Sequence, residues 1–461
     1  RGRWEEAEHW SLGAVPGTAG HTDDSVRFST IWTTALGPST TVLDNASLAA
    51  LDLEAVTLRS LFGSIGNTSP QANRFSYLFV TGSSEAPLVL NLGADDNTLA
   101  YTLYADNTMP LTVAHAILNI NGVSTGYAID FRRRAAGQES QHRFQHSVVA
   151  VRSAATVKGF CLRGTDVNPH GPIAEMESCT LIVTNGAGTA NIELTSNGDT
   201  NYARAELHLT DTILLGNRLT LNQASYFRFD GNAAEPSRLS DTLRFGSLGG
   251  RADLISGTVE VAQCTADVSS SITTNPAHYV PILNVTGATL LVTGNFNWNS
   301  SLADASPNTW QANIWDGNLF CQNLYLGGVN TNPDQYTLFV YGGQVSVSNL
   351  TRLGYPNDSG RHGPGRVVVS SGVFQTGELR LGYPSRSDGH YIQTGGSAII
   401  TNTVTLYTDG LGYGTKRFRV DEAATLTLQG PGMVAYGSLP WCGDLLAESN
   451  LVRSEERRVG K

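Results

Sequence analysis

The sequence predicts an all-β fold, a right-handed parallel β-helix (β-solenoid) of about 15 to 18 coils. Composition is the first observation behind this prediction, because the 461 residues include 49 Gly and only 15% charged residues. The second is the lack of any long segment whose apolar residues recur at helical spacing. The third is a template that starts again at Gly317, Gly343, Gly372 and Gly396. A repeat of roughly 25 residues is typical of solenoids.

Alternating apolar residues give each repeat one buried face. Val345 and Val347 are separated by one polar residue, and side chains two apart point to the same side of a strand. The same spacing separates Leu379 and Leu381. A strand this short buries its apolar face only when the equivalent strand of the next repeat stacks on it, about 4.8 Å away. With Gly at the corners to permit the bends, the repeats predict parallel ladders around an apolar interior.

Two earlier segments, 174–185 and 205–217, follow the same scheme less regularly. Each ends in Asn after an apolar strand, and the distance between their starts, about 30 residues, is also within the range of solenoid repeats. Asn is a tolerant turn residue, so it suits the end of a strand. A β-sandwich is the main alternative fold. It would need hairpin signals about every 8 to 12 residues, whereas Asn-Gly is rare in this chain.

The cysteines show no metal-binding pattern. They are widely spaced and never form a Cys-x-x-Cys motif, which is the common ligand spacing of structural zinc sites. We expect packed free thiols, and the alternative is a disulfide between Cys161 and Cys179 across one coil. The five positions are Cys161, Cys179, Cys264, Cys321 and Cys442.

Two motifs resemble a known family. Residues 390–396, His-Tyr-Ile-Gln-Thr-Gly-Gly, resemble the Tyr-x-Gln-Thr-Gly-Gly repeats of secreted planctomycete and verrucomicrobial β-solenoid proteins related to autotransporter passengers. The opening, with Trp10, a Pro-Gly turn and the acidic pair Asp23 and Asp24 before a strand, is similar to the capping coil of such proteins. The resemblance implies a bacterial surface protein that is exported from the cell. It implies no activity, and it leaves the mode of attachment open.

These observations divide the chain into five parts. We expect a capping coil at 1–30, an irregular β-solenoid at 31–310, a regular repeat solenoid at 311–430 and a shortened continuation at 431–452. Residues 453–461 resemble the translation of a sequencing-adaptor sequence, with a charge density well above that of the rest of the chain. We therefore expect this tail to be non-native. The start without Met leads us to expect that the natural N-terminus and an export signal lie upstream.

Charge and motifs exclude several classes of function. A net charge of −10 makes nucleic acid an improbable partner, because the phosphate backbone repels an acidic protein. No apolar run approaches the roughly 20 residues that span a bilayer, so we expect no membrane span in this chain. The sequence also lacks the motifs of serine hydrolases, zinc proteases, P-loop proteins and dinucleotide-binding proteins. No cofactor is expected.

One outer face is the best candidate for catalysis. Enzymes that cleave acidic polysaccharides on this type of scaffold gather carboxylates and Arg on neighbouring coils. Glu175 and Glu177 alternate on one predicted strand, and Glu206 and His208 occupy equivalent positions one repeat later. Side chains two apart on a strand lie about 6.5 to 7 Å apart, a separation that suits acid/base catalysis. We favour the alternative interpretation, in which these residues are the solvated face of an amphipathic strand.

A second group could bind an acidic sugar. Asp130, Arg132 and Arg134 alternate and could place a carboxylate beside two cations for a uronate ligand, although a surface ion-pair patch explains them better. His142 and His146 flank Arg143, and we interpret both as loop histidines because no acidic partner for a metal lies nearby. Acidic turns could hold calcium weakly, but turn chemistry accounts for them. They lie at 95–97, 197–199 and 357–359.

Three tryptophans allow a third function. Trp298, Trp310 and Trp315 are close in sequence and could form an exposed platform for glycan binding. We prefer the interpretation that they plug one end of the solenoid interior.

The sequence thus favours a non-enzymatic extracellular or cell-surface protein, a spacer, adhesin or matrix component that presents its loops to glycans or cells. The competing hypothesis is a polysaccharide lyase or glycoside hydrolase on the same scaffold.

Overall fold

The computed structural model describes a series of residue ranges within the chain. The chain divides into two compact units, 1–240 and 241–461, which we describe separately. The described ranges are 2–3, 25–30, 40–44, 50–53, 55–60, 77–92, 101–106, 111–122, 127–133, 141–153, 158–164, 170–185, 191–196, 204–222, 225–246, 249–266, 281–300, 310–328, 336–354, 364–382, 387–407, 416–436, 445–447 and 451–453.

Every regular element within these ranges is a β-strand, and none is a helix. No described helix therefore has the length and hydrophobicity of a bilayer-spanning segment. The strands of the first unit are β1 (Gly2–Arg3), β2 (Ser25–Thr30), β3 (Thr40–Asp44), β4 (Ala50–Leu53), β5 (Ala55–Ser60), β6 (Tyr77–Thr81), β7 (Leu88–Leu92), β8 (Tyr101–Asp106), β9 (Leu111–Ala114), β10 (Ala116–Gly122), β11 (Tyr127–Arg133), β12 (Gln141–Gln145), β13 (Val148–Ser153), β14 (Lys158–Gly164), β15 (His170–Glu177), β16 (Thr180–Asn185), β17 (Asn191–Ser196), β18 (Arg204–Leu221) and β19 (Ser225–Gly231), and β20 (Ser237–Phe245) contains the boundary.

The described elements of the second unit are also β-strands. Its strands are β21 (Gly250–Ser256), β22 (Thr258–Ala266), β23 (Ile282–Val285), β24 (Thr289–Ser300), β25 (Trp310–Ile314), β26 (Asn318–Gly328), β27 (Tyr336–Val340), β28 (Gln344–Leu353), β29 (Gly365–Val369), β30 (Val373–Leu381), β31 (Gly389–Gln393), β32 (Ser397–Ile400), β33 (Thr403–Tyr407), β34 (Lys416–Val420), β35 (Thr425–Leu428), β36 (Gly432–Tyr436), β37 (Leu445–Ala447) and β38 (Leu451–Arg453).

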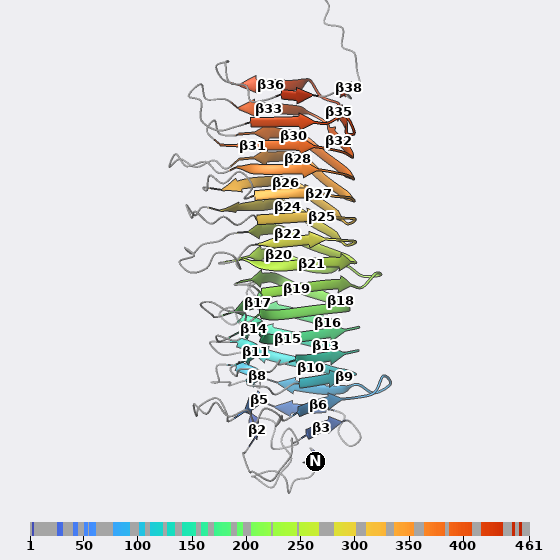
Figure 1. Cartoon of the computed structure of the whole chain (residues 1–461). Helices are drawn as coiled ribbons and strands as arrows, with labels where there is room; N and C mark the ends of the chain where they lie inside the picture. The colour runs from blue at the N-terminus through green and yellow to red at the C-terminus, as the bar shows by residue number, and fades with distance from the viewer. Residues whose placement is uncertain are drawn as a thin grey trace, which may run out of the picture. The chain divides into compact units, whose positions relative to one another are not determined.

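The strands of each unit stack in parallel ladders, as expected for a β-solenoid (Figure 1). In the first unit, sheet A consists of β1, β3, β6, β9, β12, β15, β18 and β19. In the second unit, sheet A consists of β21, β23, β25, β27, β29, β31, β34 and β37. Sheet A thus has eight described strands in each unit. The predicted parallel solenoid is confirmed, and the β-sandwich alternative is wrong.

Sheet B of each unit follows sheet A along every coil. In the first unit it has two ladders, β2 to β17 by way of β5, β8, β11 and β14, and β4 to β16 by way of β7, β10 and β13. The long strand β18 pairs with β15, β16 and β17 in turn. In the second unit, β22, β24, β26, β28 and β30 stack in one ladder, which then divides to pair with β32 and β33.

The apolar interior runs along the stacked strands. In the first unit, Val113, Phe144, Met176, Leu209 and Phe229 follow one another in register, and each is at most 1% exposed. Complete burial of one such side chain stabilises a fold by about 1.5–3 kcal/mol, so a continuous column holds successive coils together.

The second unit keeps the register that the repeats predict. Asn318 lies opposite Gln344, Gln344 opposite Val373 and Val373 opposite Ser397. Each of these four residues directly follows a glycine that starts a repeat in the sequence. The length of each coil therefore equals the spacing of the repeat starts, which confirms that each repeat is one coil.

The structure tests the predictions about four of the cysteines, but not those about Cys442 and the two ends of the chain. The described cysteines Cys161, Cys179, Cys264 and Cys321 are buried free thiols, as expected, and the alternative Cys161–Cys179 disulfide is not formed. Burial raises the pKa of Cys179 to about 11 and that of Cys321 to about 12, so both stay protonated at neutral pH. Cys442, the opening motif at 10–24 and the tail after Arg453 lie outside the described residues.

Candidate functional site

The four candidate catalytic residues lie on the outer face of sheet A in the first unit. Glu175 and Glu177 belong to β15, and Glu206 and His208 belong to β18. The prediction placed Glu206 opposite Glu175, whereas the register pairs Glu175 with His208. The coil is therefore two residues longer here than the sequence repeat predicted. Because two residues are one full period of a strand, the error leaves all four side chains on the predicted face.

Each of the three acids has its own partner. The Oε2 atom of Glu175 lies 3.3 Å from Nε of Arg143, and Glu177 accepts a hydrogen bond of 3.0 Å from Nε2 of Gln145. Both partners lie on β12, one coil earlier. Oε2 of Glu206, in contrast, lies 3.0 Å from Nε2 of His208 on its own strand. The register thus places His208, with its partner Glu206, opposite Glu175, whereas the carboxylates of Glu175 and Glu177 both bind side chains of the preceding coil.

The register adds residues that the sequence did not single out. Arg143, Glu175, His208 and Arg228 lie opposite one another on four consecutive strands, so that charged or titratable side chains form one column. The edge of the His208 ring also contacts Tyr226, with ring centroids 5.5 Å apart. These positions can be recognised from the sequence as neighbours only when the exact number of residues in each coil is known. The irregular repeat in this part of the chain hides that length.

His142 does not lie in a loop, contrary to the prediction. It is a residue of β12 whose side chain is 0% exposed and stacks on Phe131, with ring centroids 4.1 Å apart. Its Nδ1 accepts a hydrogen bond of 3.3 Å from the backbone N–H of Leu111. Burial lowers the pKa of His142 to about 3, so the ring is neutral at physiological pH. His146 does occupy the turn after β12 and stacks on His115, with centroids 5.0 Å apart.

Asp130 is held between two arginines, but they are not the expected pair. Its carboxylate is 0% exposed and accepts hydrogen bonds of 2.6 Å from Nε of Arg132 and 2.9 Å from Nε of Arg163. Arg163 comes from the next coil and also lies over the ring of Tyr127, 4.0 Å from its centroid. Arg134 lies outside the described residues. These groups contact one another, so the described part of the cluster is a partly buried ion-pair network, and the uronate site stays a prediction.

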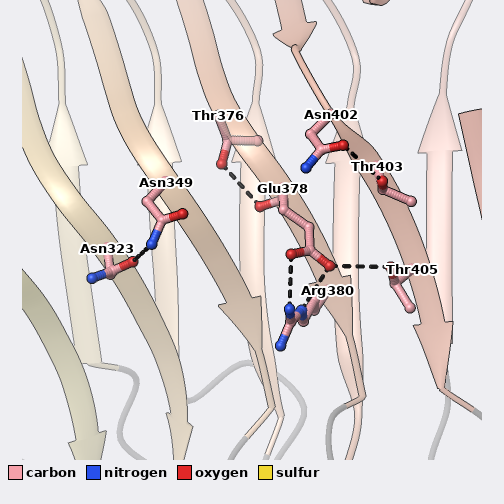
Figure 2. A network of polar contacts seen from close by, with 8 residues as sticks. All are labelled: Asn323, Asn349, Thr376, Glu378, Arg380, Asn402, Thr403 and Thr405. Carbon is pink, nitrogen blue, oxygen red and sulfur yellow. Dashed lines mark hydrogen bonds and ion pairs between the residues drawn. The ribbon is translucent and has the colours of Figure 1, made fainter. Parts of the chain in front are cut away.

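Outward polar side chains of the second unit also contact one another between coils. Nδ2 of Asn349 donates to Oδ1 of Asn323 over 2.9 Å, and Nδ2 of Asn323 donates to Oδ1 of Asn295 over 2.8 Å. Figure 2 shows the Asn349–Asn323 contact of this ladder and also Glu378, whose carboxylate binds Arg380 through two hydrogen bonds of 2.7 and 2.8 Å. Thr405 of the next coil donates to the same carboxylate over 3.3 Å, as Figure 2 also shows.

The three tryptophans differ in position. Trp298 and Trp310 are 0% and 5% exposed and pack among interior aromatic rings. They lie inside the solenoid but, contrary to the prediction, do not plug an end of it, because strands of the second unit stack on both sides of β24 and β25. Trp315 is 44% exposed, so the prediction that it lies in the interior is wrong. It follows β25, and its indole stacks on the ring of Tyr341, with centroids 4.1 Å apart and planes 15° apart. The reason is strand parity, because Trp310, Ala312 and Ile314 point inward and the next residue does not continue that row.

No group of three or more potential metal ligands occurs among the residues whose placement is described. The three acidic turns considered for calcium, at 95–97, 197–199 and 357–359, lie outside those residues.

Comparison of the chain with protein-family models, with curated proteins and with solved structures finds no match.

Proposed function

We propose that the chain is an extracellular or cell-surface structural β-solenoid, which presents its loops and outer faces to glycans or neighbouring cells and carries out no reaction on them. The observation that supports this most is the pairing of outward polar side chains with one another. Asparagine ladders and ion pairs connect successive coils where a catalytic groove would need side chains directed at a ligand.

The candidate acids illustrate the point. Acid/base cleavage of a glycosidic bond needs two carboxyl groups on opposite sides of one bond. Glu177 instead binds Gln145 of the preceding coil, and Glu206 binds His208 of its own strand. The Glu175 carboxylate, although its side chain is 39% exposed, lies against Arg143. Such contacts add a little to the stability of the stacked coils, about 0.2–1 kcal/mol for an exposed pair.

The test is a screen of the full chain against acidic and neutral polysaccharides, in which both binding and product release are measured. We expect binding without release of reducing or unsaturated ends. Release that is abolished in Glu206→Gln and in His208→Ala, and retained in the matched surface variant Thr210→Ala, would overturn the structural function and support a lyase or hydrolase. Binding of no polysaccharide at all would remove the adhesive part of the proposal.

A further inference from the structure

The outer face of the second unit carries an aromatic stack at the corner where sheet A passes into sheet B. Trp315 is the exposed large hydrophobic side chain of the described part of the chain. One face of its indole is covered by Tyr341, which lies one coil further along. Tyr341 in turn lies nearly parallel to Phe339, with ring centroids 5.4 Å apart and planes 8° apart. The stack holds the indole in one orientation on the surface.

The other face of the indole is directed at small residues. Trp315 lies opposite Thr286 of the preceding coil, since its backbone N–H donates to the carbonyl of Val285 over 2.9 Å and the N–H of Asp316 donates to the carbonyl of Thr286 over 2.9 Å. Thr286 and the following Gly287 are both exposed. Adjacent coils are about 4.8 Å apart. A side chain as short as Thr therefore leaves most of this indole face open.

From this geometry we propose that the open face of Trp315 binds a pyranose ring of a neutral glycan, an inference that rests on the glycan-presenting function proposed above. A pyranose ring has flat faces of C–H groups, which pack against an aromatic face, and hydroxyl groups around its edge. The space beside Trp315 is bounded on one side by the indole plane, and exposed Thr286 lies opposite it on the preceding coil. Because Thr286 is small, a sugar ring can occupy the space beside the indole that a larger residue at this position would fill.

Charge selects the class of sugar. Asp316 follows Trp315 and is exposed, so its carboxylate can accept hydrogen bonds from sugar hydroxyls. The same charge repels uronic acids and sulfated sugars at close range. Gly342 of the next coil leaves room for Asp316, because a Cβ atom on Gly342 would lie 2.8 Å from Oδ1 of Asp316 and 2.0 Å from the carbonyl oxygen of Trp315. The corner is thus shaped for a neutral ring beside an acceptor.

Binding to the full chain tests the site with two opposite changes. The probes are neutral hexasaccharides of glucose, mannose and xylose, with hexagalacturonate as the acidic probe, and affinity is measured by titration calorimetry. We expect Trp315→Ala to weaken binding of a neutral probe about tenfold, the scale of one lost aromatic contact. Trp315→Tyr retains a ring and restores most of the affinity. Thr286→Trp fills the space beside the indole, so it abolishes binding although it removes no residue of the aromatic stack.

The control is Ser370→Ala, which changes the next residue of the same corner beyond Tyr341 and leaves affinity unchanged. Circular dichroism of each variant establishes that it is folded. Equal affinity of the wild type and Trp315→Ala for a bound glycan would overturn the Trp315 site and leave the proposed glycan-presenting function standing. Binding of hexagalacturonate in preference to the neutral probes would overturn the neutral class. Failure of the wild type to bind any probe would overturn the site and the glycan part of the proposed function together.

Discussion

The two units make the same corner between sheets A and B in different ways. In the first unit, four residues other than Gly have left-handed backbone conformations, with φ from 47° to 51°, and they are His115, His146, Ser178 and Asp211. In the second unit, four corner residues with φ from 63° to 76° are all Gly, namely Gly257, Gly343, Gly372 and Gly396. A left-handed conformation is about 1–2 kcal/mol less favourable for residues with a Cβ atom than for Gly.

Side-chain contacts offset that strain in the first unit. The His115 and His146 rings stack, Oγ of Ser178 donates to Asp211 over 3.1 Å, and Asn232 donates to the same carboxylate over 2.8 Å. In the second unit the backbone itself packs closely, and a Cβ atom on Gly372 would lie 2.6 Å from the carbonyl oxygen of Gly343. One fold is therefore stabilised by a column of side chains in one unit and by close backbone packing in the other.

Substitution of a corner glycine is expected to have the largest effect. Gly372→Ala combines an unfavourable φ of 74° with a backbone clash, so we expect the free energy of unfolding to fall by about 3 kcal/mol. Gly432→Ala is the matched control, because its φ is 99° but nothing lies within 4 Å of the added Cβ atom. It should lower the same free energy by only about 1 kcal/mol. Urea titration followed by circular dichroism measures both, and equal losses would show that close packing contributes nothing.

Gln393 is expected to rank second. Its buried side-chain amide accepts a hydrogen bond of 3.2 Å from the Tyr391 hydroxyl and donates to the carbonyls of Thr425, over 3.0 Å, and Gly396, over 3.3 Å. Gln393→Leu removes all three hydrogen bonds from the interior, although the Gly396 carbonyl keeps one from the backbone N–H of Thr425, and we expect a loss of about 2–3 kcal/mol. The neighbouring Thr394→Ala removes only a 3.4 Å contact to Val369 and serves as the control. A Leu variant as stable as the wild type would mean that these hydrogen bonds are replaced by water.

The residues at the corners explain why the coil length was predicted correctly in the second unit and incorrectly in the first. The regular coils were predictable because Gly317, Gly343 and Gly372 mark equivalent corners in the sequence and their spacing equals the register. His146 and Asp211 occupy the same corner in the first unit but give no such signal, so the coil length there was predicted two residues too short.

For the candidate site, the sequence predicted which face the residues lie on, but not which residues of neighbouring coils they contact. Strand parity placed Glu175 and His208 on one face correctly, since an error of two residues preserves the face. The Glu175 partner Arg143 and the Asp130 partner Arg163 were missed, because a contact between coils depends on the true coil length. The Tyr-x-Gln-Thr-Gly-Gly motif pointed to a family resemblance, and the contacts of Gln393 now give it a structural role within one corner.

The third prediction concerns the pH dependence of stability that buried His142 gives to the first unit. Burial lowers the pKa of His142 to about 3, against about 6.5 in an unfolded chain. Below pH 6.5 the unfolded chain takes up a proton that the folded chain does not, so this stability is fully present above that pH and is lost as pH falls toward 3. The expected loss at pH 5 is about 2 kcal/mol relative to pH 7. His142→Phe should remove that part of the pH dependence in urea titrations, whereas His146→Phe, a change at the surface, should retain it.

Asp211 is expected to show the smallest effect and the clearest contrast with Gly372. Asp211→Ala keeps the strained backbone, with φ of 47°, and removes the acceptor for Ser178 and Asn232, so we expect a loss of about 1–2 kcal/mol. Asp211→Gly removes the same acceptor but relieves the strain, and its loss should be about 1 kcal/mol smaller. Asp211→Asn, which keeps both an acceptor and a tolerated left-handed conformation, should stay near wild type. If the Gly variant were less stable than the Ala variant, the conclusion that side-chain contacts at this corner offset backbone strain would be wrong.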